Sequence, residues 1–464
     1  MVGELFMYIN HEEVYELLEE GKKASRNDIL NILEKAREKK GISHKDIASL
    51  LQLDDRELEA EMFKVAGEIK NSIYGKRVVL FAPLYISDYC VNNCVYCGYK
   101  KCNNFKRRKL TQDEIKEEVK ILEKMGHKRL ALELGEDPVN APIEYVLESL
   151  DTIYKTQNEN GNIRRVNVNI AATTVENYKK LKDANIGTYI LFQETYHKPT
   201  YEIMHPHSLK SSYEYHLNAF DRAMEAGIED VGGGVLFGLS DPKFEVLSLM
   251  MHNEHLEKRF GVGFHTISVP RIRQAEGVTL ENFPYLLSDN MFRKIVAIIR
   301  IAVPFTGIIM STREDEAMRR DALKFGVTQV SSGSSTGVGG YKQREEGNSI
   351  EQFKTSDERT PLEVLNWLLD EGYIPSYCTA CYRKGRTGET FMGLAKTGEI
   401  QNMCEPNALM TLMEYALDYG DEETCNKTEK IVNDEILKIN NESIKSFVNE
   451  GIIKLKEGKR DIYI

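Results

Sequence analysis

A (β/α)8 TIM barrel, with helices before it and a mainly helical region after it, is the fold that this sequence predicts. Eight short β-branched or aromatic segments follow one another, and amphipathic helices separate most of them. The chain of 464 residues is also long enough to enclose a large core. A doubly wound open sheet is the alternative, but eight strand–helix units favour the barrel over that fold.

The region before the first strand is predicted to be helical. Residues 1–75 contain three stretches, including HEEVYELLEEGKKA and RNDILNILEKAREKK, in which apolar residues recur at helical spacing with charged residues between them. We therefore expect an N-terminal helical region over residues 1–75.

The barrel is expected over residues 76–341. Its predicted strands are 78–87, 128–135, 165–172, 188–195, 230–238, 265–271, 305–312 and 328–335. Two helices between them have clear ends, because residues 111–126 begin with a Thr/Glu capping pattern and residues 173–187 stop at a glycine. After Gly340 the alternation ends, residues 342–360 are polar and linker-like, and we expect a C-terminal domain over 342–464.

The charge balance disfavours two classes of partner. The chain has 61 basic and 72 acidic residues, a net charge of −11, which argues against a nucleic-acid or anionic-membrane binder. No apolar run has the length of a membrane span, and the first residues lack a signal-peptide pattern. We expect a cytoplasmic protein that binds neither nucleic acid nor membrane, in which clustered cysteines indicate metal or catalysis rather than disulfides.

The first cysteine group lies in DYCVNNCVYCGYKKC, residues 88–102. Cys90, Cys94 and Cys97 have the spacing C-x3-C-x2-C directly after the first predicted strand, at the end where barrels place their chemistry. Three thiolates on a four-iron cluster leave one iron open to a substrate. A structural zinc site with Cys102 as fourth ligand is the alternative, which a single C-x2-C knuckle disfavours.

A second group, Cys378, Cys381 and Cys404, has the spacing C-x2-C-x22-C in the C-terminal region. This spacing alone favours zinc. With an iron–sulfur site upstream, it favours a second cluster that also has an open iron. Cys425 lies in a charged helical stretch and is expected to be free.

Polar side chains mark the ends of two predicted strands. Gln193 and Glu194 end the fourth strand, where a bound amine would be the partner that a buried carboxylate needs. Arg271 and Arg273 end the sixth strand, where a guanidinium fork suits a carboxylate ligand, although an ion pair with a loop acid is an equal alternative. His265 begins the sixth strand and is expected at the opposite end of the barrel, where the C-terminal region can cover it.

These motifs resemble the radical S-adenosylmethionine (SAM) enzymes, whose signature is C-x3-C-x-aromatic-C after the first strand of a barrel. The resemblance implies that Cys90, Cys94 and Cys97 hold a 4Fe–4S cluster, that its open iron binds SAM, and that one electron cleaves SAM to methionine and a 5′-deoxyadenosyl radical. The segment LELGEDP resembles the Gly-Glu element of these enzymes. The cofactor-binding residues implied are Tyr96, Gly135, Glu136, Asn169, Gln193 and Arg273.

With the second cysteine group, the sequence resembles more narrowly the tyrosine lyases of FeFe-hydrogenase maturation. LFQETYH, HTISVPRIR and SSTGVGGY also match that family. The resemblance implies cleavage of L-tyrosine to p-cresol and a glycine-derived fragment that becomes carbon monoxide and cyanide, with catalytic roles for Arg271 and Glu194. It also implies a labile iron held by His265 beside the second cluster, a ferredoxin- or flavodoxin-like electron donor, and other hydrogenase maturation proteins as partners.

Three positions, Gly233, Ser335 and Gln274, depart from the family pattern and put substrate geometry in question more than the reaction class. A 2-iminoacetate synthase of thiamine biosynthesis makes the same cut in tyrosine, but it lacks the C-terminal cysteine group. A non-catalytic iron–sulfur carrier is a further alternative, in which the Gly-Glu element and Tyr96 would have no purpose.

Overall fold

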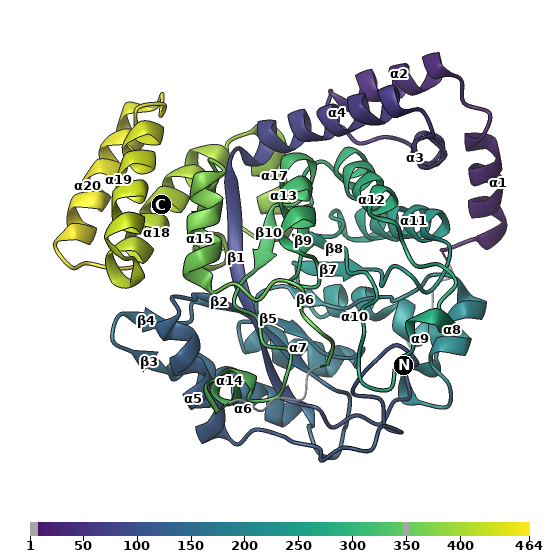
Figure 1. Cartoon of the computed structure of the whole chain (residues 1–464), viewed down its shortest axis with the longest axis horizontal. Coiled ribbons are helices and arrows are strands. Elements are labelled where there is room, and N and C mark those ends of the chain that lie inside the picture. Colours follow the sequence, from purple (N-terminus) through teal and green to yellow (C-terminus); the bar gives the residue numbers. More distant parts are fainter. Residues whose placement is uncertain (1–7, 347–351) are drawn as a thin grey trace.

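A closed parallel barrel forms the centre of the computed structural model, which describes residues 8–346 and 352–464 (Figure 1). Its strands are β1 (Arg77–Ser87), β2 (Arg129–Leu134), β5 (Arg165–Asn169), β6 (Tyr189–Ile190), β7 (Val231–Gly234), β8 (Thr266–Ser268), β9 (Gly307–Met310) and β10 (Gln329–Ser331). Each strand pairs in parallel with the next, and β10 closes the barrel on β1 by the pair Val79↔Gln329. The predicted (β/α)8 barrel is confirmed, although most strands are shorter than the predicted segments.

Helices cover the outside of the barrel. They are α5 (Gln112–Lys124), α6 (Ile143–Lys155), α7 (Val175–Asp183), α8 (Lys198–Met204), α9 (Tyr213–Leu217), α10 (Ala219–Glu225), α11 (Pro242–Phe260), α12 (Asp289–Ala302) and α13 (Glu316–Phe325). The predicted capping pattern is present at α5, where Thr111 and Glu114 bond each other's backbone N–H groups. Within the described ranges, no helix has both the length and the apolar character that crossing a membrane requires.

Four N-terminal helices lie along one side of the barrel (Figure 1). They are α1 (His11–Gly21), α2 (Arg26–Ala36), α3 (His44–Leu51) and α4 (Arg56–Tyr74). The apolar stripe of α4, including Met62, Val65 and Ile69, is buried where the helix packs on α12 and α13. This packing joins the N-terminal helices to the barrel.

The C-terminal region is mainly helical, as expected. Its elements are α14 (Gly340–Glu346), α15 (Pro361–Asp370), β11 (Ile374–Ser376), α16 (Ala380–Arg383), α17 (Gly388–Thr397), α18 (Gln401–Tyr419), α19 (Glu422–Ile436) and α20 (Glu442–Lys456). The predicted linker 342–360 begins within α14, and its residues 347–351 lie outside the described residues. Its later part is anchored, because the buried Asp357 forms an ion pair with Arg319 of the barrel.

Strand β11 was not predicted, and it determines where the second cysteine group lies. It pairs in parallel with the first residues of β1, from Arg77↔Ile374 to Val79↔Ser376. Cys378 follows β11 by two residues, so this pairing brings the C-terminal region to the N-terminal end of the barrel strands.

Candidate active site and metal centres

The barrel has a cavity toward each end of its strands. Phe81 and Ser331 line the first cavity, while Val79 and Gln329, two residues earlier on the same strands, line the second. A strand advances about 3.3 Å per residue, so the two linings are separated by about 7 Å along the barrel. The cavity volumes are about 240 Å³ and about 100 Å³.

The loop after β1 brings the first cysteine group together. Cys90, Cys94 and Cys97 all line the first cavity, whereas Cys102 is exposed. The backbone N–H of Tyr99 donates to Cys97 Sγ over 3.4 Å. Burial raises the pKa of Cys94 to about 12 and that of Cys97 to about 11, so a metal that binds these thiols has to displace their protons.

Gly135 and Glu136 follow β2 and lie against the cysteine loop. A Cβ atom at Gly135 would be 2.5 Å from the Tyr89 carbonyl oxygen and 3.0 Å from Cys90 Cβ, so this close approach requires glycine. The Asn92 amide donates to Glu136 Oε2 over 2.5 Å, and burial raises the pKa of Glu136. The cysteine loop and the Gly-Glu element therefore form one continuous wall of the first cavity.

Glu194 and Tyr96 meet at a lysine that sequence analysis missed. Lys210 Nζ donates to Glu194 Oε1 over 2.8 Å and to Tyr96 Oη over 3.2 Å. His205 Nδ1 lies 2.7 Å from the Tyr201 carbonyl oxygen, so its Nε2 accepts from Tyr96 Oη over 2.8 Å. Lys210 thus supplies, within the chain, the cation that Glu194 was expected to find in a ligand. A single lysine in a short 3-10 turn carries no sequence signal for this role.

Glu133, Asn169 and Arg313 line another part of the same cavity. The Asn169 amide donates to Glu133 Oε2 over 2.7 Å, and burial raises the pKa of Glu133 to about 8. The Arg313 guanidinium lies 3.3 Å from the ring centroid of Phe353, and burial lowers its pKa. Sequence analysis missed Glu133 and Arg313. Their place at the ends of β2 and β9 was the available signal.

Arg271 and Arg273, which we expected to bind a ligand carboxylate, lie outside the lining of the first cavity. Arg271 forms ion pairs with Glu314 and, over 2.8 Å, with Asp289. Arg273 donates to Glu314 Oε2 over 2.9 Å. The ion-pair alternative therefore describes both arginines. Gln193 is buried and also lies outside the lining.

The second cavity brings Cys378, Cys381, Cys404 and His265 together, although they come from the C-terminal region and the start of β8. His265 Nδ1 lies 3.5 Å from Asp230 Oδ1, and the His265 ring packs 4.9 Å from the ring of Phe391, measured between centroids. A carboxylate beside one ring nitrogen leaves the other nitrogen for a metal. The histidine expected at this end of the barrel thus lies in one cavity with the three thiols.

Arginines surround the second cysteine group. Arg77, Arg129 and Arg386 line the cavity, and Arg129 Nη2 donates to the Cys378 carbonyl oxygen over 2.8 Å. A hydrogen bond from Cys381, together with the charges of Arg77 and Arg386, lowers the pKa of Cys404. The same contact raises the pKa of Cys381.

Both cysteine groups suit a cluster by their arrangement. In the part of the chain that the structure describes, no three His, Cys, Asp or Glu side chains converge on a point for a single metal ion. An iron–sulfur cluster binds each thiolate on a different iron, so its ligands surround a cavity instead of meeting at one point. Three thiols around each cavity, with backbone N–H groups donating to Cys97 and Cys378 sulfur, fit this requirement.

Models of two protein families match the sequence. They are the Radical SAM superfamily, over residues 84–249, and the Biotin and Thiamin Synthesis associated domain, over residues 268–374. A 2-iminoacetate synthase of Salmonella typhimurium is 27% identical over 75% of this chain and 90% of that protein. Radical SAM membership implies SAM and a 4Fe–4S cluster as cofactors.

Solved structures match the whole architecture. A crystal structure of HydG, described as a maturase of the [FeFe]-hydrogenase, is 54% identical with a TM-score of 0.96, covering 98% of this chain and all of that one. HydG from Carboxydothermus hydrogenoformans is 37% identical with a TM-score of 0.84, covering 95% and 97% of the two chains. The chain therefore belongs to the radical SAM superfamily and, within it, to the HydG family of [FeFe]-hydrogenase maturases.

Proposed function

We propose that this maturase is a lyase that cleaves L-tyrosine to p-cresol and a glycine-derived fragment, which yields carbon monoxide and cyanide on iron at the second cysteine group. One observation carries the proposal. A histidine and three thiols line a cavity at one end of the barrel, and a C-x3-C-x2-C loop lines a cavity at the other end. Each cavity thus has ligands for its own metal group.

In the first cavity, Cys90, Cys94 and Cys97 would hold the 4Fe–4S cluster, which supplies the open iron and the electron that cleave SAM when both are bound. Gly135 brings the backbone close to the cysteine loop. Glu136 and Tyr96 line the same cavity. The Glu136 carboxylate would accept hydrogen bonds from the methionyl amine, and the Tyr96 ring would pack on the adenine. A ferredoxin- or flavodoxin-like protein would provide the electron.

Arg313 replaces Arg271 as the residue that we expect to bind the tyrosine carboxylate. Its guanidinium lines the first cavity, and a planar fork binds a carboxylate through two parallel hydrogen bonds. With a pKa of about 8, Glu133 keeps its proton at neutral pH, so it can donate a hydrogen bond to the substrate. Fixing the substrate at its carboxylate would bring its amine hydrogen to the 5′-deoxyadenosyl radical in a reactive geometry.

In the second cavity, which His265 lines together with Cys378, Cys381 and Cys404, the histidine would bind a single iron beside a cluster held by the three thiols. Asp230 lies beside His265 Nδ1, which leaves Nε2 for the metal. A small fragment released in the first cavity would have to cross the roughly 7 Å of barrel between the two linings before it could approach this iron. Other hydrogenase maturation proteins would then receive the iron-bound product. A 2-iminoacetate synthase would make the same cut but would have no use for the second cavity.

The test is an anaerobic assay of the iron-reconstituted protein with SAM, dithionite and L-tyrosine, which follows p-cresol, 5′-deoxyadenosine, carbon monoxide and cyanide together. We expect all four products. Arg313→Lys should lower p-cresol formed per 5′-deoxyadenosine about tenfold, because lysine cannot form the two-pronged contact. Arg273→Lys is the matched control, since Arg273 pairs with Glu314 outside the cavity lining. Absence of p-cresol from the wild-type protein would contradict the proposal, and an unchanged ratio would remove Arg313 from it.

A further inference from the structure

Residues 460–464 run beside the loop that carries Cys378 and Cys381. Asp461 Oδ2 lies 2.6 Å from Arg383 Nη1, and the carbonyl oxygen of Ile464 accepts from Arg386 Nη2 over 2.7 Å. The Arg383 guanidinium also lies 4.1 Å from the ring centroid of Tyr463. Arg383 and Arg386 follow Cys381 by two and five residues, so these contacts fix the chain immediately after a cluster thiol.

The same five residues also bond the helix that carries Cys404. The backbone N–H of Asp461 donates to Glu414 Oε2 over 2.8 Å, and that of Ile464 donates to Asn407 Oδ1 over 2.9 Å. Arg460 adds an ion pair with Asp418 over 2.6 Å. Since Asn407, Glu414 and Asp418 all belong to α18, the segment joins α18 to the Cys378–Cys381 loop.

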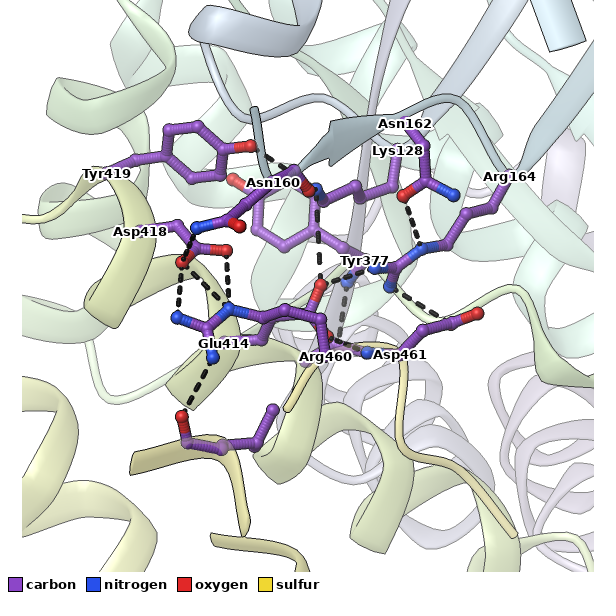
Figure 2. A network of polar contacts seen from close by, with 12 residues as sticks. Lys128, Asn160, Asn162, Arg164, Tyr377, Glu414, Asp418, Tyr419, Arg460 and Asp461 are labelled. Carbon is purple, nitrogen blue, oxygen red and sulfur yellow. Dashed lines mark hydrogen bonds and ion pairs between the residues drawn. The ribbon is translucent and has the colours of Figure 1, made fainter. Parts of the chain in front are cut away.

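Residues 460–464 also contact the barrel, through Arg164 (Figure 2). Arg164, directly before β5, places Nη1 3.2 Å from Asp461 Oδ1 and Nη2 2.5 Å from Glu414 Oε1. Arg164 and Glu414 are almost completely buried, so each charge depends on its partners. Despite partial burial, the hydrogen bond from Arg383 and the charge of Arg164 hold the pKa of Asp461 below its ordinary value. The Asp461 carboxylate thus joins the cysteine loop, through Arg383, to the barrel, through Arg164.

We propose that residues 460–464 form a strap that holds the Cys378–Cys381 loop and the Cys404 helix in the geometry of the second metal site, with Asp461 as its positioning residue. The inference rests on the proposed function in so far as these thiols bind a cluster. It assigns Asp461 no contact with the metal. Its role is to keep three thiols, carried by separate elements, around one cavity.

The substitution Asp461→Asn removes the negative charge of the carboxylate and leaves the rest of residues 460–464 unchanged. Asp461 has a left-handed backbone with φ of 60°, a conformation that asparagine also tolerates, so the variant keeps the backbone and the size of the side chain. Glu429→Gln is the matched control, because it removes an exposed ion pair to Lys456 between α19 and α20, away from the cysteine loop. The first measurement is the rate at which iodoacetamide alkylates each cysteine of the full-length metal-free protein, read by mass spectrometry.

We expect Asp461→Asn to speed alkylation of Cys378 and Cys381 about threefold or more, because the loop opens more often without its carboxylate anchor. Cys90, Cys94 and Cys97 of the same molecule should keep their wild-type rates, and Glu429→Gln should change none. Wild-type rates in Asp461→Asn would overturn the strap. Equal acceleration at both cysteine groups, Cys90, Cys94 and Cys97 as well as Cys378, Cys381 and Cys404, would also overturn it, because that result means a general loosening of the fold.

A second measurement separates positioning from stability. In the reconstituted, reduced protein, Asp461→Asn should alter the electron paramagnetic resonance signal of the second cluster and leave the SAM-dependent change of the first cluster signal intact. An unaltered second signal would count against the strap. If the wild-type C-terminal cysteines bind no cluster, the proposed function fails, whereas the alkylation rates still decide whether the strap holds the loop.

Discussion

The two cavities surround their cysteines with different charged side chains, although their linings are only two positions apart along the same strands. In the first, burial raises the pKa of Cys94 to about 12, and the nearby Lys210 is paired with Glu194. In the second, burial also raises the pKa of Cys378, but a hydrogen bond from Cys381 and the charges of Arg77 and Arg386 lower the pKa of Cys404, and Arg129 lines the same cavity. The contrast agrees with the proposed ligands, because SAM carries a positive sulfonium and cyanide adds negative charge. Beside the first cysteine group, Glu194 already neutralises Lys210, whereas several arginines face the second group.

The largest expected effect comes from removing one thiol at each end. Cys94→Ala should lower 5′-deoxyadenosine formation at least about 100-fold, because no complete cluster remains to reduce SAM. Cys378→Ala should keep 5′-deoxyadenosine and p-cresol but lose carbon monoxide, since only the second cavity is damaged. Chromatography and a carbon monoxide trap measure these products, with Cys425→Ala as a control outside both cavities. If a folded Cys378→Ala protein forms no p-cresol, the proposal that the two cavities carry out separate steps is wrong.

A smaller effect is expected from His265→Ala. The variant should retain p-cresol formation, bind about one iron fewer per chain, and show a weaker infrared band from iron-bound carbon monoxide, because the imidazole is not a cluster thiolate. Iron analysis and infrared spectroscopy of the same preparation provide the test. Unchanged iron content and an unchanged band would show that His265 packs against Phe391 without binding metal.

The smallest expected effect is on the pH dependence of folding stability, through Glu133, which burial in the first cavity keeps from water. The folded protein holds this proton up to a pH of about 8, whereas an unfolded glutamate releases it near its ordinary pKa of about 4.3. Between these values the folded state binds more protons, so this group makes stability fall as pH rises. Glu133→Gln should therefore be more stable than the wild type at pH 8, by at least about 1 kcal/mol, and equal to it at pH 4.

Urea unfolding of the metal-free proteins at both pH values measures this difference. Glu144→Gln, at an exposed helix position, provides the control. An equal stability of Glu133→Gln and wild type at pH 8 would mean that the carboxyl is ionised in the folded cavity, and the contrast between the two ends would then be weaker than the structure indicates.

The barrel could be predicted from the sequence because each strand is a short apolar or β-branched segment followed by an amphipathic helix. Strand β11 escaped prediction because it has only three residues, Ile374–Ser376, with a proline at its centre. Arg271 and Arg313 show a second limit of prediction from the sequence. Arg271 and Arg313 each follow a barrel strand, and only the position of Glu314, which pairs with Arg271, explains why Arg313 is the one that lines the cavity. His265 could be placed because strand direction alone assigns it to the N-terminal end.

Strand β1 fixes the distance between the two cysteine groups. Its last residue, Ser87, comes three residues before Cys90, and its first residues pair with β11, two residues before Cys378. Both cysteine loops are thus attached to one extended strand, which paired neighbours flank on both edges and which cannot shorten or bend without breaking the barrel. A hinge motion of the C-terminal region could not bring the two cysteine groups together while β11 stays paired with β1. In the proposed reaction, the intermediate itself would therefore have to move between the two cavities, and it would have to be small enough to pass through the packed interior of the barrel.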